Sequence, residues 1–174
     1  MASRTRINLA LQGGGAHGAF TWGVLDRMLA DDRIEIAAIS GTSAGAMNAA
    51  AVADGLTQAG RQAARQRLED FWTGISEMAG TGPWLRGPIE VMTGSWNLDM
   101  SPAYWALDTA KHKRIFLHRV PPASTMLEYG ASSKFNPEFA FLAHLRDLGR
   151  ASAEHWLDQT VGKLGQQSTI DFEI

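Results

Sequence analysis

The chain has 174 residues and a formal net charge of −2, which suits a single soluble domain with its own hydrophobic core. So small a charge gives no field that would favour nucleic acid. The absence of cysteine excludes disulfides, thiolate metal sites and a cysteine nucleophile. No apolar stretch approaches the roughly 20 residues of a membrane-spanning helix. The first apolar run, over residues 7–11, is too short for a signal peptide, so we expect a cytoplasmic protein.

Strands and helices alternate in the first part of the chain. Residues 7–12 form a short apolar run that ends in glycines and predicts a strand, and apolar residues at helical spacing predict a helix over 18–30. A second strand is predicted over 33–40, and a helix of mostly small residues over 44–53. This order is typical of an α/β fold with a small, mainly parallel sheet flanked by helices.

The second part of the chain is more helical. An apolar stripe predicts one long helix over 56–78, followed by a loop over 80–102 that is either a lid or a packed Ω-loop. Alternating apolar and polar residues predict a third strand over 113–120, which two prolines terminate. A last long helix is predicted to begin with Asn136 as its N-cap and Pro137 in its first turn.

Residues 41–45 have the G-x-S-x-G pattern of a nucleophile elbow, between a predicted strand and a predicted helix. A serine hydroxyl is a weak nucleophile unless the fold presents it, and a strained turn at Ser43 would do so. Gly41 and Gly45 leave room where side chains would collide in so sharp a turn. The N–H of Ala44, at the start of the next helix, can point at a developing oxyanion. We therefore predict Ser43 as the catalytic nucleophile.

A second glycine motif, G-x-G-x-x-G, spans residues 13–18 and ends at Gly18. A dinucleotide site would need an acidic residue at the end of the second strand, but Glu35 stands at its start. Because both glycine loops follow the carboxyl ends of parallel strands, we expect the first loop to face Ser43 and to hold the oxyanion. The N–H groups predicted for this role belong to three consecutive glycines, Gly13, Gly14 and Gly15.

Residues 11–20 (LQGGGAHGAF) and 39–49 (ISGTSAGAMNA) resemble the two signature motifs of the patatin-like phospholipase family, in its bacterial branch. The similarity continues through 96–102 and resumes at 130–134, so most of the chain resembles the two ends of such proteins. The resemblance implies a three-layer α/β fold, formed here by one domain over residues 1–174.

The same resemblance implies a serine acyl hydrolase of lipid catabolism, a phospholipase or esterase with a Ser–Asp dyad and no catalytic histidine. Ser43 matches the nucleophile, and the three glycines match the oxyanion loop. The implied substrates are lipid acyl esters, met at a membrane surface or as micelles, and no metal or organic cofactor is needed. Gln12 replaces an acidic residue that often precedes the glycines, and His17 replaces an Arg or Lys.

The catalytic base is the main departure from the family pattern. In the family this aspartate lies in an Asp-Gly-Gly or Asp-Gly-Ala motif, which this sequence lacks. Asp54 precedes a glycine but would stand roughly 16 Å from Ser43 along a helix. Asp99 and Asp108 are substitutes that do not match the motif. We infer that the chain is shortened near residues 110–111, and the alternative function is a catalytically impaired lipid-binding protein.

A Ser-His-Asp triad is a further alternative. An α/β-hydrolase orders its residues serine, acid and histidine, and Ser43, Asp99 or Asp108, and His118 follow that order. However, the elbow of that fold normally follows several strands, whereas only two are predicted before Ser43. We expect His118 to be a packed residue of the third strand. The oligomeric state is left open.

Overall fold

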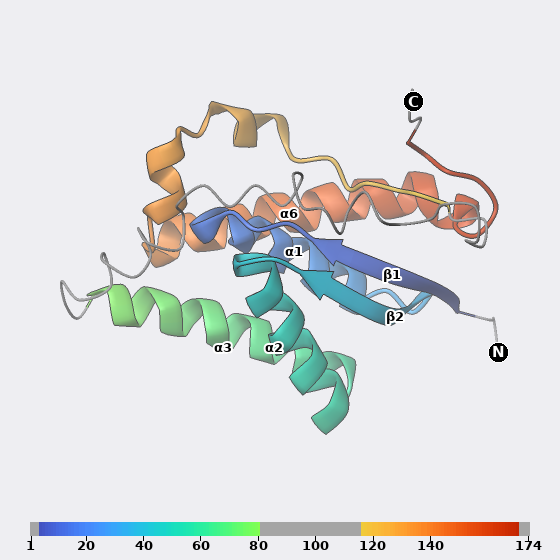
Figure 1. Ribbon diagram of the computed structural model, residues 1–174, viewed down its shortest axis with the longest axis horizontal. Coiled ribbons are helices and arrows are strands. Elements are labelled where there is room, and N and C mark those ends of the chain that lie inside the picture. Colours follow the sequence, from blue (N-terminus) through green and yellow to red (C-terminus); the bar gives the residue numbers. More distant parts are fainter. Residues whose placement is uncertain (1–3, 81–115, 171–174) are drawn as a thin grey trace, which may run out of the picture.

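A computed structural model describes residues 4–80 and 116–170, and there the chain is mixed α/β with a two-stranded parallel sheet flanked by helices (Figure 1). This arrangement confirms the predicted fold class. The elements in chain order are β1 (Thr5–Leu11), η1 (Gly15–His17), α1 (Gly18–Leu29), β2 (Ile34–Gly41), α2 (Ala44–Gln58), α3 (Arg61–Gly80), η5 (Ser124–Glu128), η6 (Ala131–Phe135), α6 (Phe139–Thr160) and η7 (Val161–Lys163). None of the helices in these two ranges has the length and apolar character that crossing a bilayer requires.

The two strands pair in parallel, from Thr5 opposite Ile34 to Leu11 opposite Gly41. Along β1 the residues alternate between half-buried and exposed, because successive side chains point to opposite faces of a strand. Since the strands are parallel, their carboxyl ends lie at the same edge of the sheet. The glycine loop after β1 and the serine turn after β2 therefore start side by side (Figure 1).

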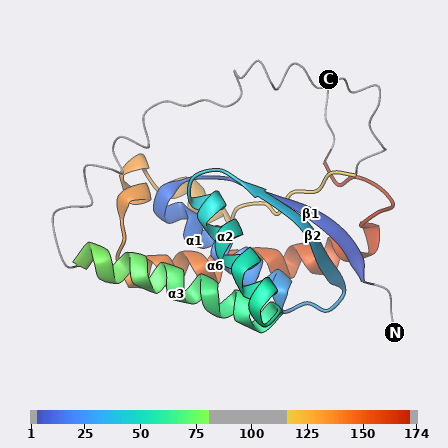
Figure 2. The same ribbon diagram turned by 60° about the horizontal axis from the view of Figure 1, so that its bottom comes forward.

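The core is built around α1, which lies against α6 and α3 as well as the sheet (Figure 2). Helices α1 and α6 come closest at two glycines. A Cβ atom on Gly23 would collide with the carbonyl oxygen of Arg146, and one on Gly149 would collide with that of Phe20. The two backbones can approach this closely only because neither position carries a side chain.

A buried carboxylate joins helices α1, α3 and α6. Asp26 of α1 is 6% exposed; it accepts a hydrogen bond from Arg65 of α3 at 2.7 Å and forms an ion pair with Arg150 of α6 at 2.9 Å. Beside it, the rings of Trp22 and Trp72 stack with centroids 6.4 Å apart. Two guanidinium groups compensate the cost of removing one carboxylate from water, so this cluster fixes how α3 and α6 lie on α1.

The expectation of one helix over 56–78 was wrong, because the chain breaks between α2 and α3. Gly60 adopts φ of 84°, a left-handed conformation that ends α2, and its N–H donates to the carbonyl of Gly55. A Cβ on Gly55 would collide with the backbone of Ala64, so α3 crosses α2 directly after the break. The apolar stripe behind the prediction, from Ala64 to Met78, lies within α3 and gave no sign of where that helix begins.

The expected third strand over 113–120 was also wrong in its described part, since residues 116–120 form no strand. There, Leu117 bonds to residues near the C-terminus: its N–H donates to Ser168 Oγ at 3.1 Å, and its carbonyl accepts the N–H of Thr169 at 3.0 Å. An alternating pattern predicts an extended segment but does not supply the partner strand that a sheet requires. Gly80, the first residue of the loop expected over 80–102, belongs to α3, and residues 81–102 lie outside the described residues.

The last helix exists as expected, but its cap is different. Helix α6 begins at Phe139, and its N-cap is Glu138 in place of Asn136, so Pro137 precedes the helix and does not occupy its first position. The Asn136 side chain still takes part, since its Oδ1 accepts the N–H of Glu138 at 3.0 Å. Asparagine thus forms a local turn just before the helix, a role that competes with capping for the same side chain.

Candidate active site

Ser43 stands at a sharp bend between β2 and α2. Its φ of 50° and ψ of −126° make it the one non-glycine residue with a positive φ in the described part of the chain. Such a conformation costs on the order of 1–3 kcal/mol and persists only where the surroundings enforce it. Here the N–H of Thr42 donates to Leu11 at the end of β1, and that of Gly45 donates to Thr42. The Ser43 side chain remains exposed.

The glycines on either side of Ser43 are required by close contacts. A Cβ on Gly41 would lie 2.6 Å from the carbonyl oxygen of Gly45 and 2.8 Å from the nitrogen of Ala46. One on Gly45 would collide with the carbonyl oxygen of Leu11. The turn therefore folds back on itself and on β1, with no room for a side chain at either position.

The glycine loop after β1 passes directly beside Ser43. A Cβ on Gly13 would be 3.0 Å from the Cβ of Ser43, so the backbone of the loop touches the serine. Gly14 and Gly15 follow with φ of 153° and 57°, values that favour glycine. The structure thus brings together the two segments that the sequence singled out.

The starts of α1 and α2 also meet behind these loops. A Cβ on Gly18, the first residue of α1, would lie 2.7 Å from that of Ala44, the first residue of α2. The first N–H groups of a helix have no acceptor within the helix and carry its positive partial charge. Two helix N-termini at one edge of the sheet create an environment that favours a negative charge.

A buried asparagine that the sequence did not single out fastens this arrangement. Asn48 of α2 is fully buried, and its Nδ2 donates to the carbonyl of Gly18 at 3.0 Å. Its Oδ1 accepts the indole N–H of Trp72 in α3 at 2.9 Å. One amide therefore links the helix after the serine turn, the helix after the glycine loop and α3. Only the three-dimensional contacts reveal this role.

Replacing Asn48 with leucine is expected to reduce the free energy of unfolding by about 2–3 kcal/mol, because the buried indole N–H of Trp72 loses its acceptor. The measurement is urea unfolding followed by tryptophan fluorescence. The matched control is Asn8→Leu, at an exposed position on β1, which should change stability by less than about 0.5 kcal/mol. Equal unfolding midpoints for the two variants would contradict the role given to Asn48.

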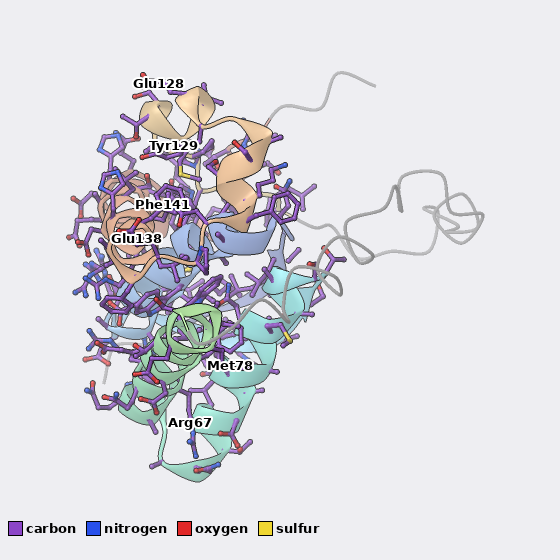
Figure 3. The ribbon with its side chains drawn as sticks, turned by 90° about the vertical axis from the view of Figure 1, so that its left-hand side faces the viewer. Arg67, Met78, Glu128, Tyr129, Glu138 and Phe141 are labelled. Atoms are coloured by element: carbon purple, nitrogen blue, oxygen red, sulfur yellow. The ribbon has the colours of Figure 1, made fainter. Side chains whose placement is uncertain are left out.

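On the other side of the glycine loop, His17 points into a polar and aromatic pocket. Its Nε2 lies 2.7 Å from the Oγ of Ser133. Its ring packs against Tyr129 and Phe141, with centroids 6.1 Å and 6.5 Å away, and Figure 3 shows these two aromatic residues together near the start of α6. Burial, and then the nearby ammonium of Lys134, lower the pKa of His17. The histidine is therefore neutral at physiological pH.

An open groove of about 960 Å³ begins at this glycine loop and runs along β1. Gly13 and Gly14 line one part of it, and Trp156 and Leu164 line another. Its remaining apolar walls come from β1, α1 and the segment after residue 116, with Ile7, Leu9, Leu11, Phe20, Val24, Leu25, Met28, Phe116, Leu117, Val120 and Met126. A groove of this size and character suits an apolar ligand.

No contact in the described part of the chain identifies a catalytic base for Ser43. In the described part of the chain, no side chain forms a hydrogen bond with the hydroxyl of Ser43. Asp54 bonds instead to Gln58 at 2.6 Å and to Arg67 at 2.8 Å. The two sequence candidates, Asp99 and Asp108, lie outside the described residues, as does the expected junction near residues 110–111.

The triad alternative gains no support from His118. Its Nδ1 lies 3.0 Å from Thr169 Oγ1, and its ring packs edge-on against Trp156 with centroids 6.2 Å apart. Burial lowers its pKa. These partners hold the histidine as a packed residue, as expected, although the strand predicted to carry it is absent from residues 116–120.

Comparison with known proteins gave one match. The family model described as patatin-like phospholipase matches residues 9–155, which include both glycine loops and most of α6. No curated protein and no solved structure matches the chain.

Proposed function

Because the chain belongs to the patatin-like phospholipase family, we propose that it is a serine acyl hydrolase that acts on lipid acyl esters. One observation carries the proposal: Ser43 is exposed, held at a strained φ of 50°, and touched by the backbone of the glycine loop. A fold maintains such strain where it serves a function, and presenting a nucleophile is a common one.

In the proposed reaction, the Oγ of Ser43 attacks the ester carbonyl and its proton passes to a base. The carbonyl oxygen becomes an oxyanion, which the N–H groups of Gly14, Gly15 and Ala44 would stabilise, with Gly13 completing the loop. The intermediate then collapses, and the alcohol leaves with the proton. Water next attacks the acyl-enzyme, releases the fatty acid and restores the Ser43 hydroxyl. The neighbouring N-termini of α1 and α2 favour the negative charge that develops.

The groove along β1 supplies the proposed binding site for the acyl chain. It starts at Gly13 and Gly14, beside the serine, and its walls are mostly aliphatic and aromatic. Burying one methylene group contributes about 0.8 kcal/mol, so such a groove would favour long acyl chains over acetyl groups. A lipid surface is the proposed source of such substrates.

A second candidate function is a lipid-binding protein with impaired turnover. It is favoured by the lack of any hydrogen-bonded partner for the Ser43 hydroxyl in the described part of the chain. In that case the groove would still hold an acyl chain, but the serine would have no base to take its proton.

Labelling with a fluorophosphonate separates the two candidates, because the probe phosphonylates an activated serine. We expect rapid labelling of the protein, located at Ser43 by mass spectrometry, and complete loss of the label in Ser43→Ala. Ser124→Ala, at an exposed serine on η5, is the matched control and should label like the parent protein. Saturable binding of a fatty acid without labelling would instead support the lipid-binding protein.

A further inference from the structure

A chain of hydrogen bonds leaves the glycine loop through His17 and ends at the carbonyl of Gly130. Ser133 Oγ donates its single proton to the carbonyl oxygen of Gly130 at 2.7 Å. A hydroxyl oxygen that has given away its proton can still accept, so the contact with His17 Nε2 is an N–H donated by the histidine. The neutral ring thus carries its proton on Nε2, and Ser133 fixes that tautomer.

The same two segments also touch through their backbones. A Cβ on Gly15 would collide with the carbonyl oxygen of Lys134, so the loop lies directly on η6. His17 ends η1, and the N–H of His17 donates to the carbonyl of Gly14 at 3.2 Å. A shift of the His17 ring would therefore move the backbone of the loop as well. Nothing else in the described part of the chain hydrogen-bonds to the His17 side chain.

We propose that Ser133 is a positioning residue for the oxyanion loop: through His17 it sets where the N–H groups of the loop stand relative to Ser43. The inference rests on the proposed function. Ser133 and His17 do not touch the reacting atoms in this scheme. They act because an oxyanion hole depends on donors held within a fraction of an ångström of their working positions.

The first test measures the loop itself and does not depend on activity. Backbone amide exchange, followed by NMR, is compared between the parent protein and Ser133→Ala. We expect the amides of His17 and Gly18 to exchange about 3- to 10-fold faster in the variant, as the loss of one neutral hydrogen bond predicts. Ser132→Ala, at the exposed neighbouring serine, is the control and should leave both rates unchanged.

The second test is a double-mutant cycle on hydrolysis of p-nitrophenyl butyrate. Ser133→Ala, His17→Phe and the double variant should each lower kcat by the same factor, about 3- to 10-fold, because each breaks the same bond. KM should stay within about twofold in Ser133→Ala, because Ser133 is not among the residues that line the groove, whereas His17 does line it. Ser133→Thr, which keeps the hydroxyl, should restore kcat, a result that a general loss of packing would not give.

Additive losses in the double variant, or unchanged amide exchange in Ser133→Ala, would overturn the proposal that Ser133 positions the loop. If the parent protein shows no Ser43-dependent hydrolysis, the proposed function fails, and amide exchange alone decides whether Ser133 anchors the loop. If Ser133→Ala does not fold, His17→Phe and Ser133→Thr carry both measurements. In that case, the proposal would be contradicted if His17→Phe had the same amide exchange rates and the same kcat as the parent protein.

Discussion

Hydrolysis of p-nitrophenyl butyrate is expected to slow by on the order of 10³-fold or more in Ser43→Ala. The substitution removes the only oxygen that the proposed mechanism gives for attack on the ester. It leaves the glycine loop in place, because alanine keeps the Cβ that contacts Gly13. The measurement is the initial rate of nitrophenol release at saturating substrate, with both proteins at equal concentration.

The control for this loss is Ser124→Ala, which removes an exposed hydroxyl on η5 and should retain the parental rate. A weak residual rate in Ser43→Ala is compatible with the mechanism, because an oxyanion hole accelerates attack by water even without the nucleophile. Equal rates in Ser43→Ala and the parent protein would rule out Ser43 as the nucleophile. No hydrolysis by the parent protein, together with fatty-acid binding, would favour the lipid-binding protein.

The serine turn could be predicted from sequence because short-range contacts determine it. Gly41 is required by atoms of Gly45 and Ala46, and Gly45 is required by the end of β1, so glycine is needed at two fixed positions around Ser43 and the pattern is recognisable in the sequence. The two strands and the helices expected over 18–30 and 44–53 followed from equally local patterns, and the structure places these helices at Gly18–Leu29 and Ala44–Gln58. A βαβ order implies that the two strands are parallel. Parallel strands bring the two loops to the same edge of the sheet.

The contacts that hold the loops in place could not be predicted in this way. Asn48 bonds to Gly18 and Trp72, and Ser133 bonds to His17, across long stretches of sequence. No local pattern distinguishes a buried asparagine in a helix of small residues from an exposed one. The break at Gly60 was missed for a related reason, since an apolar stripe records burial and not helix continuity.

The catalytic base illustrates a different limit. The family resemblance predicts an aspartate in an Asp-Gly-Gly or Asp-Gly-Ala motif, which the sequence does not contain, and spacing could not assign another residue to its role. Asp54 could be set aside from helix geometry, and its bond to Arg67 at 2.8 Å agrees with a purely structural role. The choice between Asp99 and Asp108 depends on their distance to the Ser43 hydroxyl, a quantity that sequence does not contain.

The largest loss of stability is expected from Gly23→Ala. The added Cβ would collide with the carbonyl oxygen of Arg146, which belongs to the backbone of α6 and cannot rotate away. Helices α1 and α6 would have to separate along the contact that also positions Trp22 and Asp26. Alanine favours a helix over glycine by about 1 kcal/mol, so the collision must outweigh that gain. We expect a net loss of about 3 kcal/mol or more in the free energy of unfolding, measured by urea denaturation.

Gly74→Ala is the matched control for this prediction, because both glycines lie inside helices. A Cβ at position 74 of α3 would meet no atom within 4 Å, so only the helix propensity should act. That variant should gain about 0.5–1 kcal/mol, the opposite sign to Gly23→Ala. Gly149→Ala tests the same contact from α6, where the new Cβ would collide with the carbonyl oxygen of Phe20. If Gly23→Ala and Gly149→Ala both unfolded at the same urea concentration as Gly74→Ala, the close approach of α1 and α6 would be refuted. The core that supports the glycine loop at the start of α1 would then need a different account.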